Sequence, residues 1–388
     1  MSTSGPSLQT VSTGLVVAIV GFFSSFPIVL QGIEKMGANA AEAASGLMAA
    51  AFAMGLAGIG ISLWKRQPVS VAWSTPGVAF LAISAAPENG FAGAVAAFLF
   101  AGALTMIAGL WRPLARLTAA IPAPLAQAML AGVLLSLCIV PFKALGEAPI
   151  YALPIILTWF IVGLFSRLFA VPAAVLVAAL ITAFAADFQV PLPDAILTPP
   201  ILIVPEFSLA DIVGIGIPLF IVTMATQNIP GIAILKSYGF EPAPRGLLTS
   251  VGGASVVSAA FGAPATCLAA ITAAMCANED SHPDPKRRYW SAVSAGSFYC
   301  LFGLFAVVIT GFAALAPPFV LGTLAGVALL GVFAGSASAA LQAADHREAA
   351  AITFLITASG VSIFGLGAAV WGLLIGGAVQ VLVGRFRK

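Results

Sequence analysis

The sequence predicts an all-α polytopic membrane protein with fourteen transmembrane segments arranged as a 7+7 inverted repeat. Of its 388 residues, 61% are apolar and 8% are charged, and the mean hydropathy is +1.08. Soluble domains of this length carry about 25% charged residues. The apolar runs are long and continuous rather than alternating, which indicates helices and not a β-barrel. Two of the runs, one in each half, are short and interrupted by proline and glycine, a pattern typical of secondary transporters.

Charged residues and proline-rich turns divide the chain into the predicted segments. In the first half these are 12–34, 43–64, 69–86, 90–111, 121–141, 149–166 and 171–186. In the second half they are 209–234, 246–259, 255–277, 289–313, 317–341, 348–363 and 365–384. The stretch from Asp187 to Glu206 is the longest proline-rich run and separates the halves. The first repeat is therefore expected at 1–190 and the second at 206–388.

The basic residues support this count through the positive-inside rule. With the N-terminus in the cytoplasm and strict alternation, all but Lys35 and Lys143 of the 16 Lys and Arg residues lie on the cytoplasmic side. The cytoplasmic set includes Arg112, Arg116, Arg387 and Lys388. Both termini are then cytoplasmic. Because each half has seven segments, the second half is inverted relative to the first.

The first interrupted segment is organised around Trp73-Ser74-Thr75-Pro76-Gly77. A β-prone run, 69–72, precedes it, and the apolar run 78–84 follows it. A helix needs about 20 residues to cross the bilayer, so a strand that enters to mid-membrane and a half-helix that leaves it are expected. Ser74 or Thr75 can cap the half-helix, and proline suits its first turn.

The second interrupted segment is organised around Phe261-Gly262-Ala263-Pro264-Ala265-Thr266. Here the expected strand is 255–258, before the motif, and the expected half-helix is 267–276, after it. In an inverted repeat the amino ends of both half-helices meet near the midplane. Helix amino ends carry partial positive charge, so their meeting point would favour an anion.

The composition of the spans excludes several classes of protein. No Asp, Glu, Lys, Arg or His lies deep in any predicted span, and Asp211 is expected at a membrane interface. The sequence has no catalytic triad, phosphate loop or metal-ligand spacing, and the four cysteines lie in apolar runs. We therefore expect no enzymatic activity, metal, cofactor or nucleic-acid partner.

Neutral polar side chains remain as candidates for substrate contacts. Gln227 and Asn228 are adjacent in the middle of an apolar span, where they are costly unless paired. They act either as hydrogen-bonding glue between helices or as substrate contacts. The serines near residue 25 could donate to a carboxylate. The expected substrate-binding residues are Ser24, Ser25, Phe26, Trp73, Ser74, Thr75, Gly77, Gln227, Asn228, Pro264, Ala265 and Thr266.

The energetics of such a site favour a singly charged ligand with an apolar body. Neutral donors add about 1.5–3 kcal/mol for each hydrogen bond to a charged group, and no Arg or Lys is present to hold a dianion. Moving a monoanion against an inside-negative potential costs about 2.3 kcal/mol per 100 mV, which one co-transported proton cancels. We expect that proton to travel on the substrate carboxylate or through water at Gln227 and Asn228.

The sequence resembles the benzoate/proton symporter (BenE) family of bacterial inner-membrane proteins over nearly its whole length. The resemblance is carried by Phe26-Pro27, Ala72-Trp73-Ser74-Thr75-Pro76-Gly77, Thr226-Gln227-Asn228-Ile229-Pro230-Gly231 and Phe261-Gly262-Ala263-Pro264. It implies proton-coupled uptake of benzoate or a similar aromatic monocarboxylate by a multi-pass protein of the inner membrane. It also implies the fold of nucleobase transporters and sulfate permeases, a core domain of segments 1–4 and 8–11, a gate domain of segments 5–7 and 12–14, and a homodimer.

Two alternatives stay open at this point. A carrier for a nucleobase or another small solute could use the same fold, although nucleobase carriers of this kind place acids where Gln227 and Asn228 stand. An anion channel is the other alternative. A membrane-embedded enzyme is disfavoured because no buried nucleophile and base are present.

Overall fold

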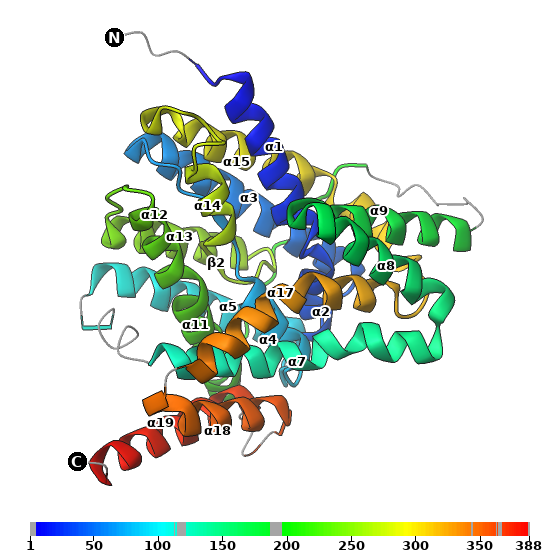
Figure 1. Ribbon diagram of the computed structural model, residues 1–388. Coiled ribbons are helices and arrows are strands. Elements are labelled where there is room, and N and C mark those ends of the chain that lie inside the picture. Colours follow the sequence, from blue (N-terminus) through cyan, green and yellow to red (C-terminus); the bar gives the residue numbers. More distant parts are fainter. Residues whose placement is uncertain are drawn as a thin grey trace.

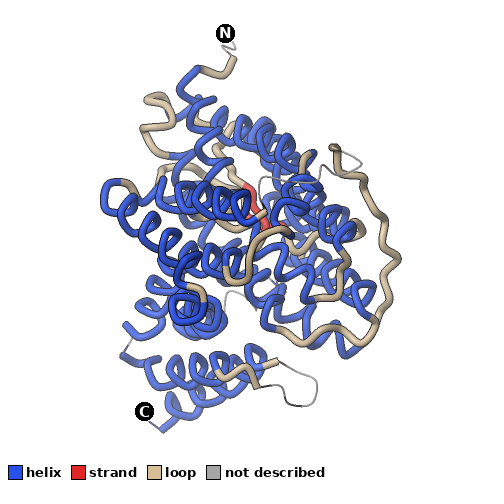
Figure 2. Tube along the Cα trace, turned by 90° about the vertical axis from the view of Figure 1, so that its right-hand side faces the viewer, coloured by secondary structure: helices blue, strands red, loops and turns tan. Residues whose placement is uncertain are grey.

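The computed structural model describes residues 5–111, 113–114, 122–186, 196–342, 344–361, 363 and 367–386. These residues form a bundle of helices around one short two-stranded sheet (Figures 1 and 2). The predicted helical membrane fold is confirmed. Residues 187–195 of the proline-rich boundary, together with Arg112, Arg116, Arg387 and Lys388, lie outside the described residues.

A helix is found at each of the fourteen predicted segments. The first half contains α1 (Leu8–Phe23), α2 (Phe26–Lys35), α3 (Ala40–Lys65), β1 (Val71–Trp73), α4 (Thr75–Ile83), α5 (Gly90–Leu110), α7 (Ala123–Glu147), α8 (Pro149–Phe165) and α9 (Arg167–Ala185). The second half contains α10 (Leu209–Asp211), η1 (Ile212–Gly216), α11 (Ile217–Thr223), η2 (Met224–Asn228), α12 (Ile229–Ser237), α13 (Pro244–Ala259), β2 (Thr266–Leu268), α14 (Ile271–Ala277), η3 (Pro285–Arg287), α15 (Tyr289–Leu304), α16 (Ala306–Ala314), α17 (Val320–Gln342), η4 (Ala344–His346), α18 (Arg347–Ala358) and α19 (Ala368–Phe386).

Length alone does not establish fourteen membrane crossings. Among the described residues, six helices are long and apolar enough to span a membrane, or seven if α15 and α16, which meet at a bend of 58°, form one span. Helices α8, α9 and α19 are shorter, and α4 and α14 are half-helices of nine and seven residues. The number fourteen, the 7+7 division and the inverted orientation therefore stay predictions.

Two predicted continuous spans are broken or distorted. The first span breaks at Ser24 and Ser25, and α2 restarts there with Pro27 in its first turn. The eighth span contains two π-helical turns, η1 and η2, the second of which holds Gln227 and Asn228. Single π-helical turns are frequent at functional sites because they redirect side chains and loosen the backbone hydrogen bonding.

The two strands pair with each other at the centre of the molecule, where Figure 2 shows them in red. They run antiparallel, with Val71 opposite Leu268, Ala72 opposite Cys267 and Trp73 opposite Thr266. Extended backbone at membrane depth must satisfy its hydrogen bonds within the protein. Each strand therefore provides the partner that the other requires, and the two halves of the chain are joined through their main chains.

The predicted position of the second strand is wrong. Residues 255–258 belong to helix α13, and the strand follows the Phe261–Thr266 motif instead of preceding it. The chain leaves α13 through a turn in which Gly262 has a φ of +86°, a conformation that favours glycine. The hydroxyl of Ser255 donates to the Thr266 carbonyl and accepts from the Thr266 main-chain N–H. These contacts hold the strand against the helix.

Small residues allow neighbouring helices to approach closely, as is usual in membrane proteins. Gly252 of α13 lies directly on the main chain of Met106 in α5, and Gly14 of α1 lies against Ser294 and Ala295 of α15. A side chain at either glycine would collide with the facing helix. These contacts hold α13, α5, α1 and α15 around the sheet.

Candidate functional site

A cavity of about 250 Å³ lies beside the sheet. Its walls come from α1 and the Ser24–Ser25 break, from β1 and α4, from η2, and from the chain between β2 and α14. Helices α7 and α17 close the opposite side through Gln127, Leu130, Leu134, Ala328, Leu329, Val332 and Ser336. Segments from both halves of the chain thus meet around one space.

The amino end of α4 forms one edge of this cavity. Ser74 is buried, and its hydroxyl accepts from the Gly77 main-chain N–H (3.1 Å) and from the Thr223 hydroxyl (2.8 Å). Ser74, one of the two predicted candidates, is the N-cap. Thr75 and Pro76 line the cavity itself. The Thr75 hydroxyl has no hydrogen-bond partner among the described residues, so it is available to a ligand.

The amino end of α14 forms another edge. Ala269, Ala270, Ile271 and Thr272 line the cavity there. The Thr272 hydroxyl is paired with the Ser70 hydroxyl at 2.8 Å, and no side chain caps the helix. Both half-helices therefore begin at the same cavity, as the sequence predicts, and their partial positive charges add there.

The adjacent residues Gln227 and Asn228 have different surroundings. Gln227 lines the cavity, and its side-chain amide makes no hydrogen bond with any described residue. Asn228 is fully buried, and its Oδ1 accepts from the Leu268 main-chain N–H of β2 at 2.9 Å. Asn228 therefore holds the sheet to the eighth span, while Gln227 has free donors and a free acceptor.

Trp73 lines the cavity near the break in the first span, and Phe22 packs behind it. The indole N–H of Trp73 donates to the Ser25 hydroxyl at 2.8 Å, and that hydroxyl donates to the Gly21 carbonyl. The Phe22 ring packs against Trp73 with centroids 5.2 Å apart. Ser24 also lines the cavity, and its hydroxyl has no described partner.

Seven of the twelve predicted residues do not line the cavity. Pro264, Ala265 and Thr266 lie in the turn and in β2, because the strand follows the motif and moves the half-helix start to Ile271. This start, and not the Pro264 motif, faces the cavity. Ser74, Gly77 and Asn228 are buried in its supporting walls, and Phe26 lines a neighbouring apolar cavity of about 260 Å³. The other five predicted residues line the cavity together: Ser24, Ser25, Trp73, Thr75 and Gln227.

Four polar cavity residues, Gln127, Thr226, Thr272 and Ser336, were not predicted. Gln127 and Ser336 come from α7 and α17, and neither side chain has a hydrogen-bond partner among the described residues. Thr226 also lines the cavity, but its hydroxyl donates to the Val222 carbonyl. An isolated glutamine within an apolar helix is the same kind of signal that marked Gln227, so Gln127 could have been found from the sequence.

The cavity walls carry polar groups without formal charge. None of the residues that line it is Asp, Glu, Lys, Arg or His. The described residues also hold no group of three or more His, Cys, Asp or Glu side chains that could bind a metal ion. The site therefore offers neutral hydrogen-bond donors, two helix amino ends and apolar surface.

A helical membrane fold with a polar cavity between broken helices defines a membrane transporter. The chain belongs to the benzoate membrane transport protein family, whose sequence pattern matches residues 5–382. It is 37% identical over 376 residues to the inner membrane protein YdcO of Escherichia coli (strain K12), covering 96% of this chain and 95% of that protein. It is 30% identical over 371 residues to the benzoate membrane transport protein of Acinetobacter baylyi, covering 95% of this chain and 94% of that protein. The protein is thus a multi-pass membrane transporter and not an enzyme.

Solved structures share the fold at low sequence identity. The murine solute carrier 26 member A9 anion transporter, in its inward-facing state, aligns with a TM-score of 0.65 and 13% identity, over 100% of this chain and 70% of that one. The transmembrane domain of the cyanobacterial bicarbonate transporter BicA aligns with a TM-score of 0.57 and 18% identity, over 97% of this chain and 95% of that one. At these identities the likeness concerns the fold alone.

Proposed function

We propose that the protein is a secondary active transporter that takes up benzoate or a similar aromatic monocarboxylate together with a proton, by alternating access. The observation that carries this proposal is an uncharged cavity in which two half-helices begin and several polar side chains lack partners among the described residues. The family supports the substrate class, since one relative is named a benzoate membrane transport protein.

The size of the cavity suits this ligand. An apolar cavity of about 150 Å³ in another protein holds a benzene ring. The cavity described here, at about 250 Å³, has room for a ring that carries a carboxylate. The ring would lie against Leu130, Leu134 and Val332, and the carboxylate would face the half-helix ends.

The free donors suit one carboxylate. Thr75, Gln227 and Gln127 each present to the cavity a donor that no described residue pairs with. Each hydrogen bond to a charged group contributes about 1.5–3 kcal/mol, so two or three offset the several kcal/mol that a buried carboxylate loses in hydration. A dianion would lose far more, and no lysine or arginine is among the described residues that line the cavity to hold it.

The position of the cavity suits alternating access. We assign segments 1–4 and 8–11 to a core domain and segments 5–7 and 12–14 to a gate domain. The half-helices then belong to the core, and α7 and α17 to the gate, so the substrate would bind at the domain boundary. Movement of one domain against the other opens the cavity to one side at a time. We place both termini in the cytoplasm and the protein in the inner membrane.

Binding to the purified protein tests the substrate class. Isothermal titration should show heat for benzoate, less for cyclohexanecarboxylate, and none for uracil, xanthine or phthalate, which is a dianion. Accumulation in proteoliposomes should follow an inward proton gradient and generate no net current. Protein-free liposomes are an essential control, because neutral benzoic acid crosses lipid unaided. Tight binding of xanthine without benzoate binding would contradict the proposal.

A small inorganic anion is the second candidate, because the two solved neighbours are described as anion and bicarbonate transporters. The apolar wall formed by Leu130, Leu134 and Val332 argues against it, since such surface adds nothing to the binding of a hydrated ion. Chloride or bicarbonate flux that benzoate does not inhibit would favour this candidate. Unitary currents would indicate a channel.

A further inference from the structure

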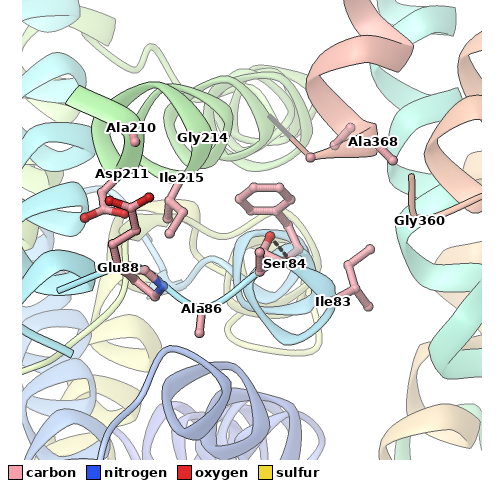
Figure 3. A pocket seen from close by; sticks show the side chains of 15 residues that line it. Ile83, Ser84, Ala86, Glu88, Ala210, Asp211, Gly214, Ile215, Gly360 and Ala368 are labelled. Atoms are coloured by element: carbon pink, nitrogen blue, oxygen red, sulfur yellow. Dashed lines mark hydrogen bonds between the residues drawn. The ribbon is translucent and has the colours of Figure 1, made fainter. Parts of the chain in front are cut away.

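A second cavity, of about 200 Å³, lies at the other end of half-helix α4 (Figure 3). The carboxyl end of α4, through Phe80, Ile83 and Ser84, forms one wall, and the start of the eighth span forms another. Two acidic residues, Glu88 and Asp211, border it. Figure 3 shows their carboxyl groups pointing toward one another.

Asp211 is buried in a way that is costly for a carboxylate. It is only 5% exposed, and its Oδ2 has no hydrogen-bond partner among the described residues. The carboxyl group lies against Gly93 in the first turn of α5, where a β-carbon added to the glycine would come within 2.6 Å of Oδ2. The Glu88 main-chain N–H donates to the Asp211 carboxyl group, but the second oxygen stays unpaired. Burying an ionised group with an unpaired oxygen is costly, so Oδ2 is placed to hold a proton or a cation.

Few other charged groups lie near the pair. Helix α5 carries no titratable residue, and neither does the segment from Ile212 to Thr223. Glu206, whose main-chain N–H donates to the Ala92 carbonyl, is exposed. Glu34 and Lys35 end α2, and the following turn packs at Gly37 against Phe91 of α5. The cavity wall formed by Gly360, Gly367, Ala368 and Ala369 carries no charge.

We propose that Asp211, beside Glu88, binds the proton that is transported with the substrate. This inference rests on the proposed proton-coupled uptake and names its proton site. The Glu88 carboxyl group, which is exposed, disfavours a negative charge on the buried Asp211 beside it. It is an alternative to the expectation that the proton travels on the substrate carboxylate or through water at Gln227 and Asn228.

The surroundings fit a proton better than a metal ion. A metal of the hard type needs about six oxygen ligands, whereas the described walls offer two carboxyl groups and the Ser84 hydroxyl, which already donates to the Phe80 carbonyl. The remaining wall residues contribute mainly apolar surface and glycine main chain. A proton requires only one unpartnered oxygen.

The pair is connected to the substrate cavity through two elements. Helix α4 runs from Thr75 at the substrate cavity to Ser84 at the acidic cavity, a length of roughly 13 Å for nine residues. The eighth span runs from Asp211 to Gln227 through two π-helical turns. The Thr223–Ser74 hydrogen bond ties these elements together. A change of charge at one end therefore reaches the groups that contact substrate at the other.

The test compares Asp211→Asn with Glu206→Gln in proteoliposomes. An inward gradient of one pH unit should raise the initial rate of benzoate uptake by wild type and Glu206→Gln above that of protein-free liposomes, in which neutral benzoic acid by itself approaches about tenfold accumulation at equilibrium. Asp211→Asn should still exchange labelled for unlabelled benzoate, but its protein-dependent initial rate of uptake should not respond to the pH gradient. Glu88→Gln should move half-maximal uptake to lower external pH, because Asp211 then releases its proton more readily. Initial rates are corrected with protein-free liposomes.

A second measurement does not depend on transport. Infrared difference spectra between acid and alkaline pH should contain a carboxyl band that Asp211→Asn removes and Glu206→Gln retains. The band reports whether Asp211 binds a proton even if Asp211→Asn also loses exchange, or if the wild-type protein does not bind benzoate. The inference would be overturned if the initial uptake rate of Asp211→Asn still responded fully to the pH gradient, if the band were unchanged, or if sodium drove protein-dependent uptake in place of protons. The first of these outcomes would contradict the role of Asp211 but not the proposed uptake of benzoate.

Discussion

At the scale of single residues, neighbours in the sequence take on separate tasks. Gln227 faces the cavity with its amide unpaired among the described residues, while Asn228 turns into the protein and accepts from Leu268 of β2. The π-helical turn that holds both residues directs them differently. The sequence could identify the pair as unusual, but it could not separate the two, because that depends on a strand 40 residues further along the chain.

We expect Gln227→Ala to weaken benzoate binding roughly ten- to hundredfold, because one donor to the carboxylate is lost. Isothermal titration of the purified variant measures the change. Gln342→Ala is the matched control, since Gln342 is exposed and its side chain bonds to Ser338 on the same helix. Equal affinity of the Gln227 variant and wild type would remove Gln227 from the binding site.

Asn228→Ala should instead lower stability, by about 1–3 kcal/mol, because the buried Leu268 N–H loses its acceptor. The apparent unfolding temperature in detergent reports this loss. Asn89→Ala provides the comparison, as Asn89 is exposed and its side chain makes no capping bond. A variant of Asn228 that is as stable as wild type but binds benzoate poorly would show that the residue serves the ligand.

At the scale of elements, the two half-helices show what the sequence could predict. The first was placed correctly because Pro76 and Ser74 fix its start through local chemistry. The second was misplaced because Val256 and Val257 have β propensity, whereas both residues lie within helix α13, which packs along α3 and α5. The role of Ser336 in α17 depends on packing against another part of the chain and could not be predicted, whereas Gln127 in α7 stands out in the sequence as an isolated glutamine within an apolar helix.

Helix packing gives a sharp element-scale prediction. Gly252→Ala should destabilise the protein by about 1–3 kcal/mol, because its new methyl group would collide with the main chain of Met106. Gly253→Ala is the control, since its β-carbon would meet nothing within 4 Å. It should be neutral or gain about 0.5–1 kcal/mol from helix propensity. Equal unfolding temperatures for the two variants would argue against the close approach of α5 and α13.

At the scale of the whole molecule, the predicted orientation can be tested directly. In a variant whose four native cysteines are replaced by alanine, Glu147→Cys should react with an impermeant maleimide in intact cells, because the alternation places it outside. Glu279→Cys, which is also exposed, should react only after permeabilisation. The reverse pattern would invert the topology and place Asp211 at the cytoplasmic end.

The pairing of β1 with β2 can form only late in biosynthesis, after both strands have been synthesised. Val71 and its partner Leu268 are separated by nearly two hundred residues. At about 5–20 residues per second, the ribosome needs roughly 10–40 s to make the intervening chain. During that interval the first strand has no partner, although lipid tolerates no open main chain. The nascent first half must therefore keep this segment near water, or shielded by the insertion machinery, until the second half arrives.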